Sequence, residues 1–523
     1  MKLLKAISVI VLFCLFAYFG YYDIMDNKLS HSYPVGYLAS DAFQHQTRAE
    51  GLKDLGNYRY EAFYNMAGYS DVVGFYSPLL YHFTIIFSDL TNLPIYDSIL
   101  ILVHLFVFIS VCFLFLWLWE FDETLALFSI PLTFFILNSQ LRFAFYWGHW
   151  PSLVGLAFVV PALYCLSDIK KYWIYFGLLF AGVILIHTPE SIMLFLFTLM
   201  YLIIKLLLKR LKFEEFKYIS YSGIIAFILS AWYLIIFAGT WLGESENAIV
   251  TYWGNPMFGL LNFDYLLPLI IIGVGLSFLY YYKTDKLIFL LPLFSLIVGF
   301  GNYFGLSWRA FQFRFFWPVF LSIAVGSVFY FAYNQWIKDK KYIVYIISAL
   351  FIFSVLYVYT DRMQPQSIVS QDQWNAFIWM QGNIPKEDNI LFLYGDGYWQ
   401  DAVLRNSKHT QYVVEKEDYI NSYKDVKKEY MIKIPSDAGT RHPYRKSFFT
   451  FGKHYYDDGG EDWRMKERAI CSFDYIVGDV RANYIPELVY SNVALFESLS
   501  NSSVIAYQNN QVVVLKNNKG ECR

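Results

Sequence analysis

Apolar runs long enough to cross a lipid bilayer recur throughout the first 360 residues of this chain, and they constrain its fold more than any other feature. A membrane-spanning helix needs about 20 predominantly apolar residues, and a backbone inside the bilayer has to satisfy its own hydrogen bonds, which favours helices. The predicted fold class is therefore a polytopic α-helical membrane protein. We predict eleven spans, at residues 5–22, 98–119, 124–138, 150–167, 172–187, 190–208, 217–238, 264–282, 286–303, 315–336 and 342–360. The first run lacks a small-x-small cleavage site, so we expect a retained signal anchor.

The connections between these runs differ in their basic residues, and the difference predicts how the chain is oriented. Cytoplasmic loops of membrane proteins carry an excess of Lys and Arg. Basic residues gather in alternate connections, at 2–5, 170–171, 205–217, 283–286 and 338–341. The pattern predicts a cytoplasmic N-terminus in the cell membrane, and an odd number of spans then puts the C-terminus outside.

Near residue 360 the composition changes from apolar to that of a water-soluble domain. We predict a multi-span membrane domain over 1–360 and an extracytoplasmic α/β domain over 361–523. The second domain has a helical pattern at 371–385 and strand patterns at 389–395, 473–479, 503–508 and 511–516. Cys471 and Cys522 both lie in this domain, and the sequence leaves open whether they pair.

Several classes of partner and cofactor are disfavoured by what the sequence lacks. The net charge is −2, which argues against a nucleic-acid partner. The chain has no GxxxxGKS/T loop and no GxGxxG motif after a strand, so no nucleotide cofactor is predicted. The five cysteines form no Cys-x-x-Cys or Cys/His cluster, so a zinc site is not indicated.

The first long connection, residues 23–97, contains a polar stretch that we expect to carry the chemistry. Residues 40–55 have a helical pattern that begins with a serine as the expected N-cap residue. Asp41, His45 and Arg48 would then stand at i, i+4 and i+7 on one face, with Asp41 near the positive end of the helix dipole. Ionisable groups at a membrane boundary favour a functional site. The alternative is an interfacial helix whose charges are solvated.

A short connection with the sequence HTPE, at 187–190, is a second candidate. Pro189 fits the first turn of the helix that follows, which would direct Glu190 to the outer surface. His187 and Glu190 would join Asp41 in holding a divalent cation, Mg²⁺ or Mn²⁺, through imidazole and carboxylate ligands. The alternative is a tight helix hairpin whose charged residues mark the water boundary, and we weigh the two equally.

Basic residues in the predicted outer connections form a third candidate, because the positive-inside rule makes cations there less expected. They are Arg142, His149, Arg309 and Arg314. Guanidinium groups bind phosphate oxygens in a bidentate fork, so we favour a phosphate site over interfacial anchors in an aromatic belt. Nucleotide-activated donors are absent outside the cell. A transferase there would need a donor delivered in the membrane, such as a sugar on a polyprenyl phosphate.

The order of these parts resembles the GT-C superfamily of integral-membrane glycosyltransferases, which use lipid-phosphate-linked sugars. DAFQHQTRAEGLKDLG, which begins at Asp41, is similar to the first outer loop of that family, and FYSPLLYH (75–82) is similar to the segment by which such loops re-enter the membrane. The same region resembles prokaryotic membrane proteins labelled as 6-pyruvoyl-tetrahydropterin-synthase-related. HTPE and LYGDGYWQD (393–401) are loosely similar to motifs of oligosaccharyltransferase catalytic subunits.

The resemblance implies an outer-face glycosyltransferase that transfers a sugar or glycan from a polyprenyl-phosphate-linked donor to a lipid, glycan or protein acceptor. Asp41 matches the essential acidic residue of the family and would act as general base. His45 and Arg48, on the same helix, complete the predicted catalytic set. Displacement would invert the anomeric carbon and release a polyprenyl phosphate, whose charge Arg309, Arg314 or Arg142 would stabilise.

Two alternatives from other functional classes stay open at this point. A transporter or flippase of lipid-linked precursors would need ionisable residues at mid-membrane depth and repeated halves, and the sequence contains no internal repeat. A non-catalytic membrane scaffold would explain the soluble domain but would leave the polar helix of residues 40–55 unexplained.

Overall fold

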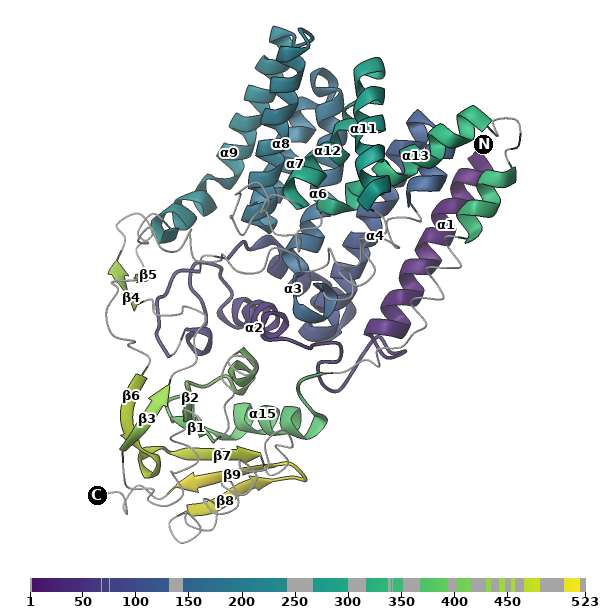
Figure 1. Cartoon of the computed structure of the whole chain (residues 1–523). Coiled ribbons are helices and arrows are strands. Elements are labelled where there is room, and N and C mark those ends of the chain that lie inside the picture. Colours follow the sequence, from purple (N-terminus) through teal and green to yellow (C-terminus); the bar gives the residue numbers. More distant parts are fainter. Residues whose placement is uncertain are drawn as a thin grey trace.

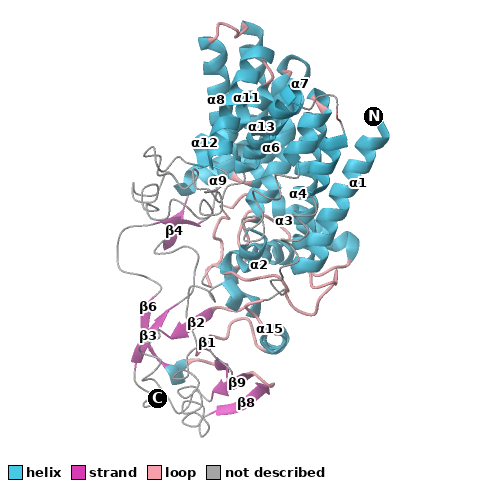
Figure 2. Cartoon of the chain, turned by 45° about the vertical axis from the view of Figure 1, so that its right-hand side comes forward, coloured by secondary structure: helices cyan, strands magenta, loops and turns pink. Residues whose placement is uncertain are grey.

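The computed structural model has two parts, a bundle of long helices and a smaller part built on strands (Figure 1). The N-terminus lies at the end of the bundle remote from the strands, and the helix α2 lies between the two parts (Figures 1 and 2). The structure describes residues 2–523 except 67, 75, 131–143, 242–266, 300–316, 337–339, 341, 351–366, 394–401, 415–428, 434–441, 447–452, 457–464, 480–502 and 518–523.

The bundle consists of apolar helices, and seven of those described are long and apolar enough to cross a membrane. These are α1 (Lys2–Tyr18) with the π-helical turn η1 (Phe19–Ile24), α4 (Ile95–Phe121), α6 (Trp150–Ser167), α7 (Ile169–Ile186), α8 (Thr188–Leu207), α9 (Phe213–Trp241) and α11 (Leu267–Thr284). Shorter helices accompany them: α3 (Leu79–Thr91), η4 (Leu287–Leu290), α12 (Leu291–Gly299), η7 (Trp317–Phe320) and α13 (Leu321–Trp336).

The predicted class, a polytopic helical membrane protein, is confirmed, whereas the count of eleven spans is not. Two of the predicted spans, 124–138 and 342–360, lie partly outside the described residues. Two others, 286–303 and 315–336, contain helices shorter than a full span. Helix α3 was expected only as a segment returning towards the membrane, because its apolar run is too short to be recognised as a span.

Small residues allow the helices of the bundle to approach closely. A Cβ atom on Gly177 of α7 would stand 2.8 Å from the carbonyl oxygen of Ser222 in α9, so this crossing requires glycine. Ser222 also donates from Oγ to the carbonyl oxygen of Trp173, at 2.7 Å. On the other side of α9, Phe227 and Ile228 remain exposed, as expected of side chains that face lipid.

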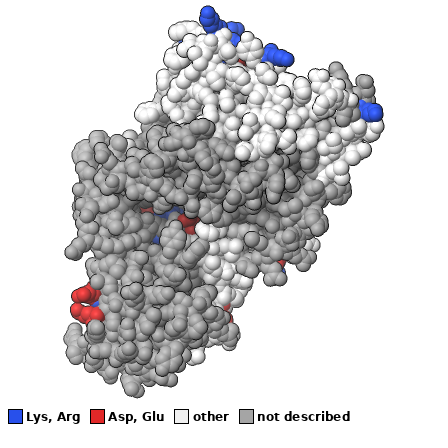
Figure 3. Space-filling model, in the orientation of Figure 1, with Lys and Arg blue, Asp and Glu red and all other residues white. Residues whose placement is uncertain are grey.

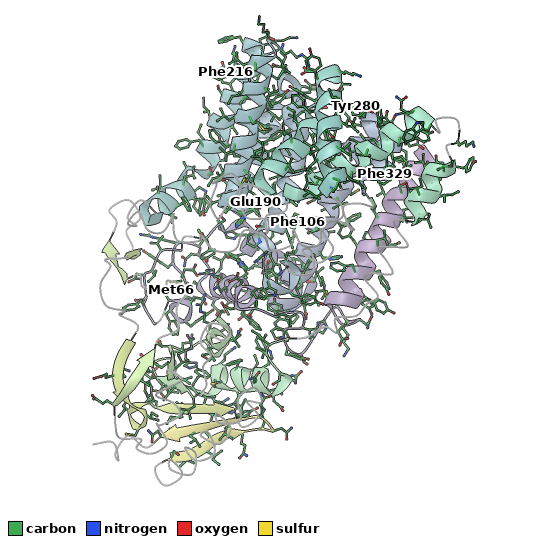
Figure 4. The ribbon with its side chains drawn as sticks, in the orientation of Figure 1. Met66, Phe106, Glu190, Phe216, Tyr280 and Phe329 are labelled. Atoms are coloured by element: carbon green, nitrogen blue, oxygen red, sulfur yellow. The ribbon has the colours of Figure 1, made fainter. Side chains whose placement is uncertain are left out.

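Basic side chains gather at the end of the bundle that is remote from the strands (Figure 3). Lys205 of α8 lies 2.7 Å from Glu215 of α9 there, and Lys170 of α7 contacts Glu214. Phe216, near the start of α9, marks the same end of the bundle (Figure 4). Basic residues of three predicted cytoplasmic connections, at 170–171, 205–217 and 283–286, therefore follow helices at this end of the bundle among the described residues.

The strand-containing part begins with helix α15 (Gln371–Asn383), and a capping box stabilises the start of this helix. Ser370 Oγ accepts a hydrogen bond from the backbone N–H of Gln373 at 3.1 Å, and Gln373 Oε1 accepts one from the backbone N–H of Ser370 at 2.9 Å. A mixed sheet follows, in the strand order β6-β3-β2-β1-β7-β9-β8. Its strands are β1 (Ile390–Phe392), β2 (Gln411–Val414), β3 (Glu429–Lys433), β6 (Met465–Ala469), β7 (Tyr475–Asp479), β8 (Ser503–Gln508) and β9 (Val512–Asn517). Strands β4 (His442–Lys446) and β5 (Lys453–Tyr456) form a separate pair.

Strand β1 is the centre of this sheet. It pairs in parallel with β2 and β7, so that Leu391 lies opposite both Tyr412 and Ile476, whereas the other pairings are antiparallel. Its residues are fully buried, and α15 packs through Trp374 and Phe377 into the same core. The domain is therefore the mixed α/β unit that the sequence predicted.

The predicted helix at 371–385 and all four predicted strands are confirmed, as α15, β1, β7, β8 and β9. Strands β2 to β6 were not predicted. Segments such as EYMIK, HPYRK and MKERA contain many charged residues and lack the regular alternation of apolar and polar residues that identifies a strand in a sequence. Cys471 is disulfide-bonded, while Cys522 and the predicted domain boundary near 360 lie outside the described residues.

The segment between α1 and α2 joins the two parts. The backbone N–H of Ile368 donates to the carbonyl oxygen of Tyr37 at 2.9 Å, and the ring of Trp374 packs edge-on against Tyr96, with centroids 5.4 Å apart. His31 Nδ1 lies 2.7 Å from a carboxylate oxygen of Asp97, in the first turn of α4. These contacts join the segment before α2 to the start of α4 and to the residues that begin the strand-containing part.

Candidate active site

Helix α2 (Ser40–Leu55) has the bounds that the sequence predicted. Its N-cap residue is Ala39, in an extended conformation with φ −147°, and no side chain caps the helix. The expectation that Ser40 is the N-cap was therefore wrong, because Ser40 already has helical geometry. At the other end Gly56, with φ +67°, terminates the helix in the left-handed conformation that glycine favours.

Asp41 stands in the first turn of α2, where it is half-buried. The backbone at this point is held by Gly148, which has φ +85° and lies directly against the helix. A Cβ atom at position 148 would stand 2.6 Å from the carbonyl carbon of Asp41. The connection before α6 thus fixes the N-terminus of α2, and with it the Asp41 backbone.

His45 lies one turn further along α2 and is buried, with 6% of its surface exposed. Its Nδ1 is 3.0 Å from the hydroxyl of Tyr81, which α3 supplies. The indole ring of Trp150, in the first turn of α6, lies 6.0 Å from the imidazole between ring centroids. His45 therefore joins α2 to two other helices.

Arg48 is also buried, with 2% of its surface exposed. Its Nε donates to Glu61 Oε1 at 3.2 Å, and its guanidinium carbon lies 3.7 Å from the ring centroid of Tyr76. The loop that follows α2 supplies both partners. The alternative of a solvated charged face is wrong, because the side chains of His45 and Arg48 are buried and contact other side chains of the protein.

The HTPE connection brings its two ionisable residues together. His187 Nδ1 contacts the carboxylate of Glu190 and lies 3.2 Å from Ser152 Oγ. Glu190 is fully buried in the first turn of α8, packed over Gly155 of α6 (Figure 4). Because the hydroxyl and the carboxylate both approach Nδ1, the arrangement differs from a serine–histidine–acid relay, which uses both ring nitrogens.

Tyr233 of α9 connects this cluster to the loop after α2. Its hydroxyl lies 3.0 Å from Ser77 Oγ and 3.2 Å from Thr188 Oγ1. Asp41, His45, His187 and Glu190 are therefore all positioned by the ends of α2, α6 and α8 that meet beside the C-terminal domain. The predicted metal set is not preformed: no described group of three His, Cys, Asp or Glu side chains could hold a metal ion.

The predicted phosphate-binding residues are only partly described. His149 is half-buried and forms the N-cap of α6, where its backbone N–H donates to Ala144 at 2.9 Å. Arg142, Arg309 and Arg314 lie outside the described residues, as does all but the first residue of LYGDGYWQD.

Sequence reasoning missed the residues that support the site. Glu61 belongs to no motif, and Tyr76 and Tyr81 lie in FYSPLLYH, which indicated only the return of the chain to the membrane; the folded loop brings all three to α2. Gly148 gave a weak signal, since a glycine between aromatic residues in YWGHW is typical of a tight turn or a close backbone approach.

Comparisons with known proteins give no match to a protein-family model and none to a curated protein. Solved structures do share the fold. The archaeal oligosaccharyltransferase AglB from Archaeoglobus fulgidus, in complex with an inhibitory peptide and a dolichol-phosphate, is similar with a TM-score of 0.55 and 11% identity, over 97% of this chain and 80% of AglB.

Two further proteins have similar structures. ArnT from Cupriavidus metallidurans in the apo state has a TM-score of 0.56 and 10% identity, over 98% of this chain and 97% of ArnT. The arabinofuranosyltransferase AftD from mycobacteria has a TM-score of 0.52 and 10% identity, over 99% of this chain but only 40% of AftD. ArnT has also been solved with undecaprenyl phosphate, and the Archaeoglobus enzyme with Zn and sulfate, with TM-scores of 0.51 and 0.56. The chain thus has the GT-C fold that the sequence resemblance implied.

Proposed function

We propose that this chain, whose fold is that of the GT-C glycosyltransferases, is a membrane glycosyltransferase that uses a polyprenyl-phosphate-linked sugar or glycan as donor. The proposal is supported by a fold likeness over nearly the whole chain. The observation that carries it is the position of Asp41, half-buried in the first turn of α2 and held there by the Gly148 turn that precedes α6. Buried contacts of His45 and Arg48 hold that helix in place.

In the proposed reaction Asp41 acts as general base. Its carboxylate takes the proton from the acceptor group, whose oxygen or nitrogen bonds to the anomeric carbon of the donor sugar. The bond from that carbon to the phosphate oxygen breaks, and the polyprenyl phosphate leaves with the electron pair. Attack opposite the leaving group inverts the anomeric carbon. His45 and Arg48 act as positioning residues in this scheme, because both contact neighbouring protein groups.

The leaving phosphate needs positive charge close to it. We assign this role to His149 and to the arginines Arg142, Arg309 and Arg314. Dolichol-phosphate is bound in the AglB complex and undecaprenyl phosphate in the ArnT complex, which supports a polyprenyl phosphate as the leaving group here. The acceptor in this scheme is a lipid, a glycan or a protein that presents a hydroxyl or amide group.

The proposed orientation has a cytoplasmic N-terminus and an extracytoplasmic C-terminal domain. The basic end of the bundle, remote from the strands, supports it through the positive-inside rule (Figure 3). The disulfide at Cys471 also supports it, because structural disulfides persist in oxidising compartments.

The sequence predicts a divalent cation with Asp41, His187 and Glu190 as ligands. The described residues do not fit that set, since His187 and Glu190 contact each other without forming a three-ligand group with Asp41. We therefore derive no step through a metal ion.

The test is transfer by the purified full chain from a pool of polyprenyl-phosphate-linked sugars, followed as loss of lipid-linked sugar. Asp41→Asn should lower the rate by about 10²–10⁴, the usual contribution of a general base. Asp89→Asn is the matched control, since Asp89 is an exposed aspartate on α3. A folded Asp41→Asn protein with the activity of the wild type would refute the proposal.

A further inference from the structure

Helix α2 has a second polar face, opposite the one that carries Asp41. Gln46, Glu50 and Asp54 follow one another at i, i+4 and i+8. At 3.6 residues per turn they lie roughly 180° around the helix from Asp41, His45 and Arg48. A helix that is polar on both sides, with one side contacting the bundle, needs a second partner.

The C-terminal domain supplies that partner through a short segment, residues 405–411. Gln46 Nε2 donates to Asn406 Oδ1 at 2.8 Å and to Glu50 Oε1 at 2.6 Å. Lys408 Nζ donates to Asp54 Oδ2 at 2.8 Å and lies 3.6 Å from Glu50 Oε2. The contact between Gln46 and Asn406 is fully buried. Burying an amide is unfavourable unless it is hydrogen-bonded. The Gln46–Asn406 pair therefore favours one position of the C-terminal domain relative to α2.

Within its own domain the 405–411 segment is rigidly held. Gln381 of α15 donates from Nε2 to the carbonyl oxygen of Asn406 at 2.6 Å. His409 is buried, with its ring nitrogens 2.6 and 3.0 Å from the carbonyl oxygens of Ser407 and Ile384. A buried, hydrogen-bonded segment transmits a displacement of the domain to α2 instead of absorbing it.

Lys408 also has a backbone conformation that lysine does not favour. Its φ is +57°, in the left-handed region that is unfavourable for residues other than glycine. Glycine would relieve that strain. The side-chain ammonium of Lys408 contacts two carboxylates of α2, Glu50 and Asp54.

We propose that Asn406 and Lys408 are positioning residues for sugar transfer, which hold α2 from the C-terminal domain so that Asp41 stands correctly on the opposite face. This rests on the proposed function. The C-terminal domain is then part of the catalytic apparatus through a mechanical contact with α2, in addition to any contact with the acceptor. A displacement of about 1 Å at a reacting group can cost about 10² in rate.

The variant Lys408→Gly separates positioning from stability, because it removes the ammonium while relieving the backbone strain. Lys209→Gly is the matched control: Lys209 has φ +55° and is exposed at the remote end of α8. We expect Lys408→Gly to lower kcat by about 10- to 100-fold with an unchanged donor KM, while the thermal midpoints of both variants stay close to that of the wild type. Lys408→Asp should also lower kcat. Adding Asp54→Lys to Lys408→Asp exchanges the two charges of the ion pair and should recover part of that lost rate.

Hydrogen exchange of α2 provides a readout that does not depend on activity. In Lys408→Gly the amides of residues 42–52 should exchange faster than in the wild type and in Lys209→Gly. Unchanged exchange in α2, or an unchanged kcat beside faster exchange, would overturn the positioning role. If the wild type transfers no sugar while α2 exchange still responds to Lys408→Gly, the coupling holds and the proposed function fails.

Discussion

Gly148 lies against the first turn of α2 so closely that a Cβ atom would stand 2.6 Å from the carbonyl carbon of Asp41. The glycine has φ +85°, so both its backbone conformation and its surroundings exclude a side chain. The proposed general base therefore takes its position from a residue more than a hundred positions later in the chain. This relationship turns the position of Asp41 into something that mutation can test without changing the carboxylate.

Gly148→Ala should displace the start of α2 and lower transfer by about 10²-fold, because the new methyl group overlaps the Asp41 backbone. Gly56→Ala is the control, since Gly56 ends the same helix at φ +67° with open space around its Cβ position. It measures backbone strain alone. Steady-state kinetics of both variants decide the matter, and equal losses would mean that strain, rather than overlap with α2, explains the effect.

Arg48→Met should lower the free energy of unfolding by about 3 kcal/mol, because Glu61 is left nearly buried without its cation. Arg48→Lys should recover only part of this, since an ammonium cannot stack on Tyr76 as the planar guanidinium does. Arg59→Met, at an exposed position in the same loop, should change stability by about 0.5 kcal/mol or less. Thermal midpoints in detergent provide the measurement, and full rescue by lysine would contradict the stacking argument.

The sequence predicted those parts of the site that depend on local pattern. The spacing of Asp41, His45 and Arg48 placed them on one face of a helix with the observed bounds. It did not show that this face is buried, because Tyr81 and Glu61 reach α2 only when the following loop folds back. The opposite face was missed for the same reason: Lys408 meets Asp54 from a domain more than 350 residues away.

Seven of the eleven predicted spans are described helices long enough to cross a membrane, and the full count stays a prediction because the other four lie partly outside the described residues. The short helix α12 lies within a longer apolar run, and composition alone does not distinguish such a run from a single spanning helix. In the C-terminal domain the apolar strands β7 and β9 were recognisable, whereas β3 and β6 have charged residues and depend on each other for pairing.

His187→Ala should destabilise the protein by about 1–3 kcal/mol, because it removes the hydrogen-bond partner of a fully buried carboxyl group. Glu190→Gln should cost less than about 1 kcal/mol, since the amide oxygen can still accept a hydrogen bond from the imidazole. The asymmetry between the two variants is the prediction. Thermal unfolding tests it, and a larger loss for Glu190→Gln than for His187→Ala would show that the carboxylate has a further partner.

The docking of α2 on the C-terminal domain should depend on pH through Glu50. Burial raises the pKa of the Glu50 carboxyl, and the nearby Lys408 ammonium opposes that shift. Since the folded protein then holds the proton more tightly than the unfolded chain, stability falls as pH rises from about 4.5 through the raised pKa. Removing Lys408 raises the pKa of Glu50 further, so the fall becomes steeper and extends to higher pH.

Lys408→Met should therefore cost less at pH 4.5, where Glu50 is protonated, than at pH 8, where the ionised Glu50 carboxylate loses the nearby ammonium and the penalty should reach about 2 kcal/mol. Adding Glu50→Gln should remove most of the pH dependence, because the titrating group is gone. Lys53→Met is the control, since Lys53 of α2 forms an exposed pair with Asp89 of α3 and its loss should cost less than about 1 kcal/mol at both pH values. A Lys408→Met penalty that is equal at both pH values would mean that Glu50 does not titrate at this contact.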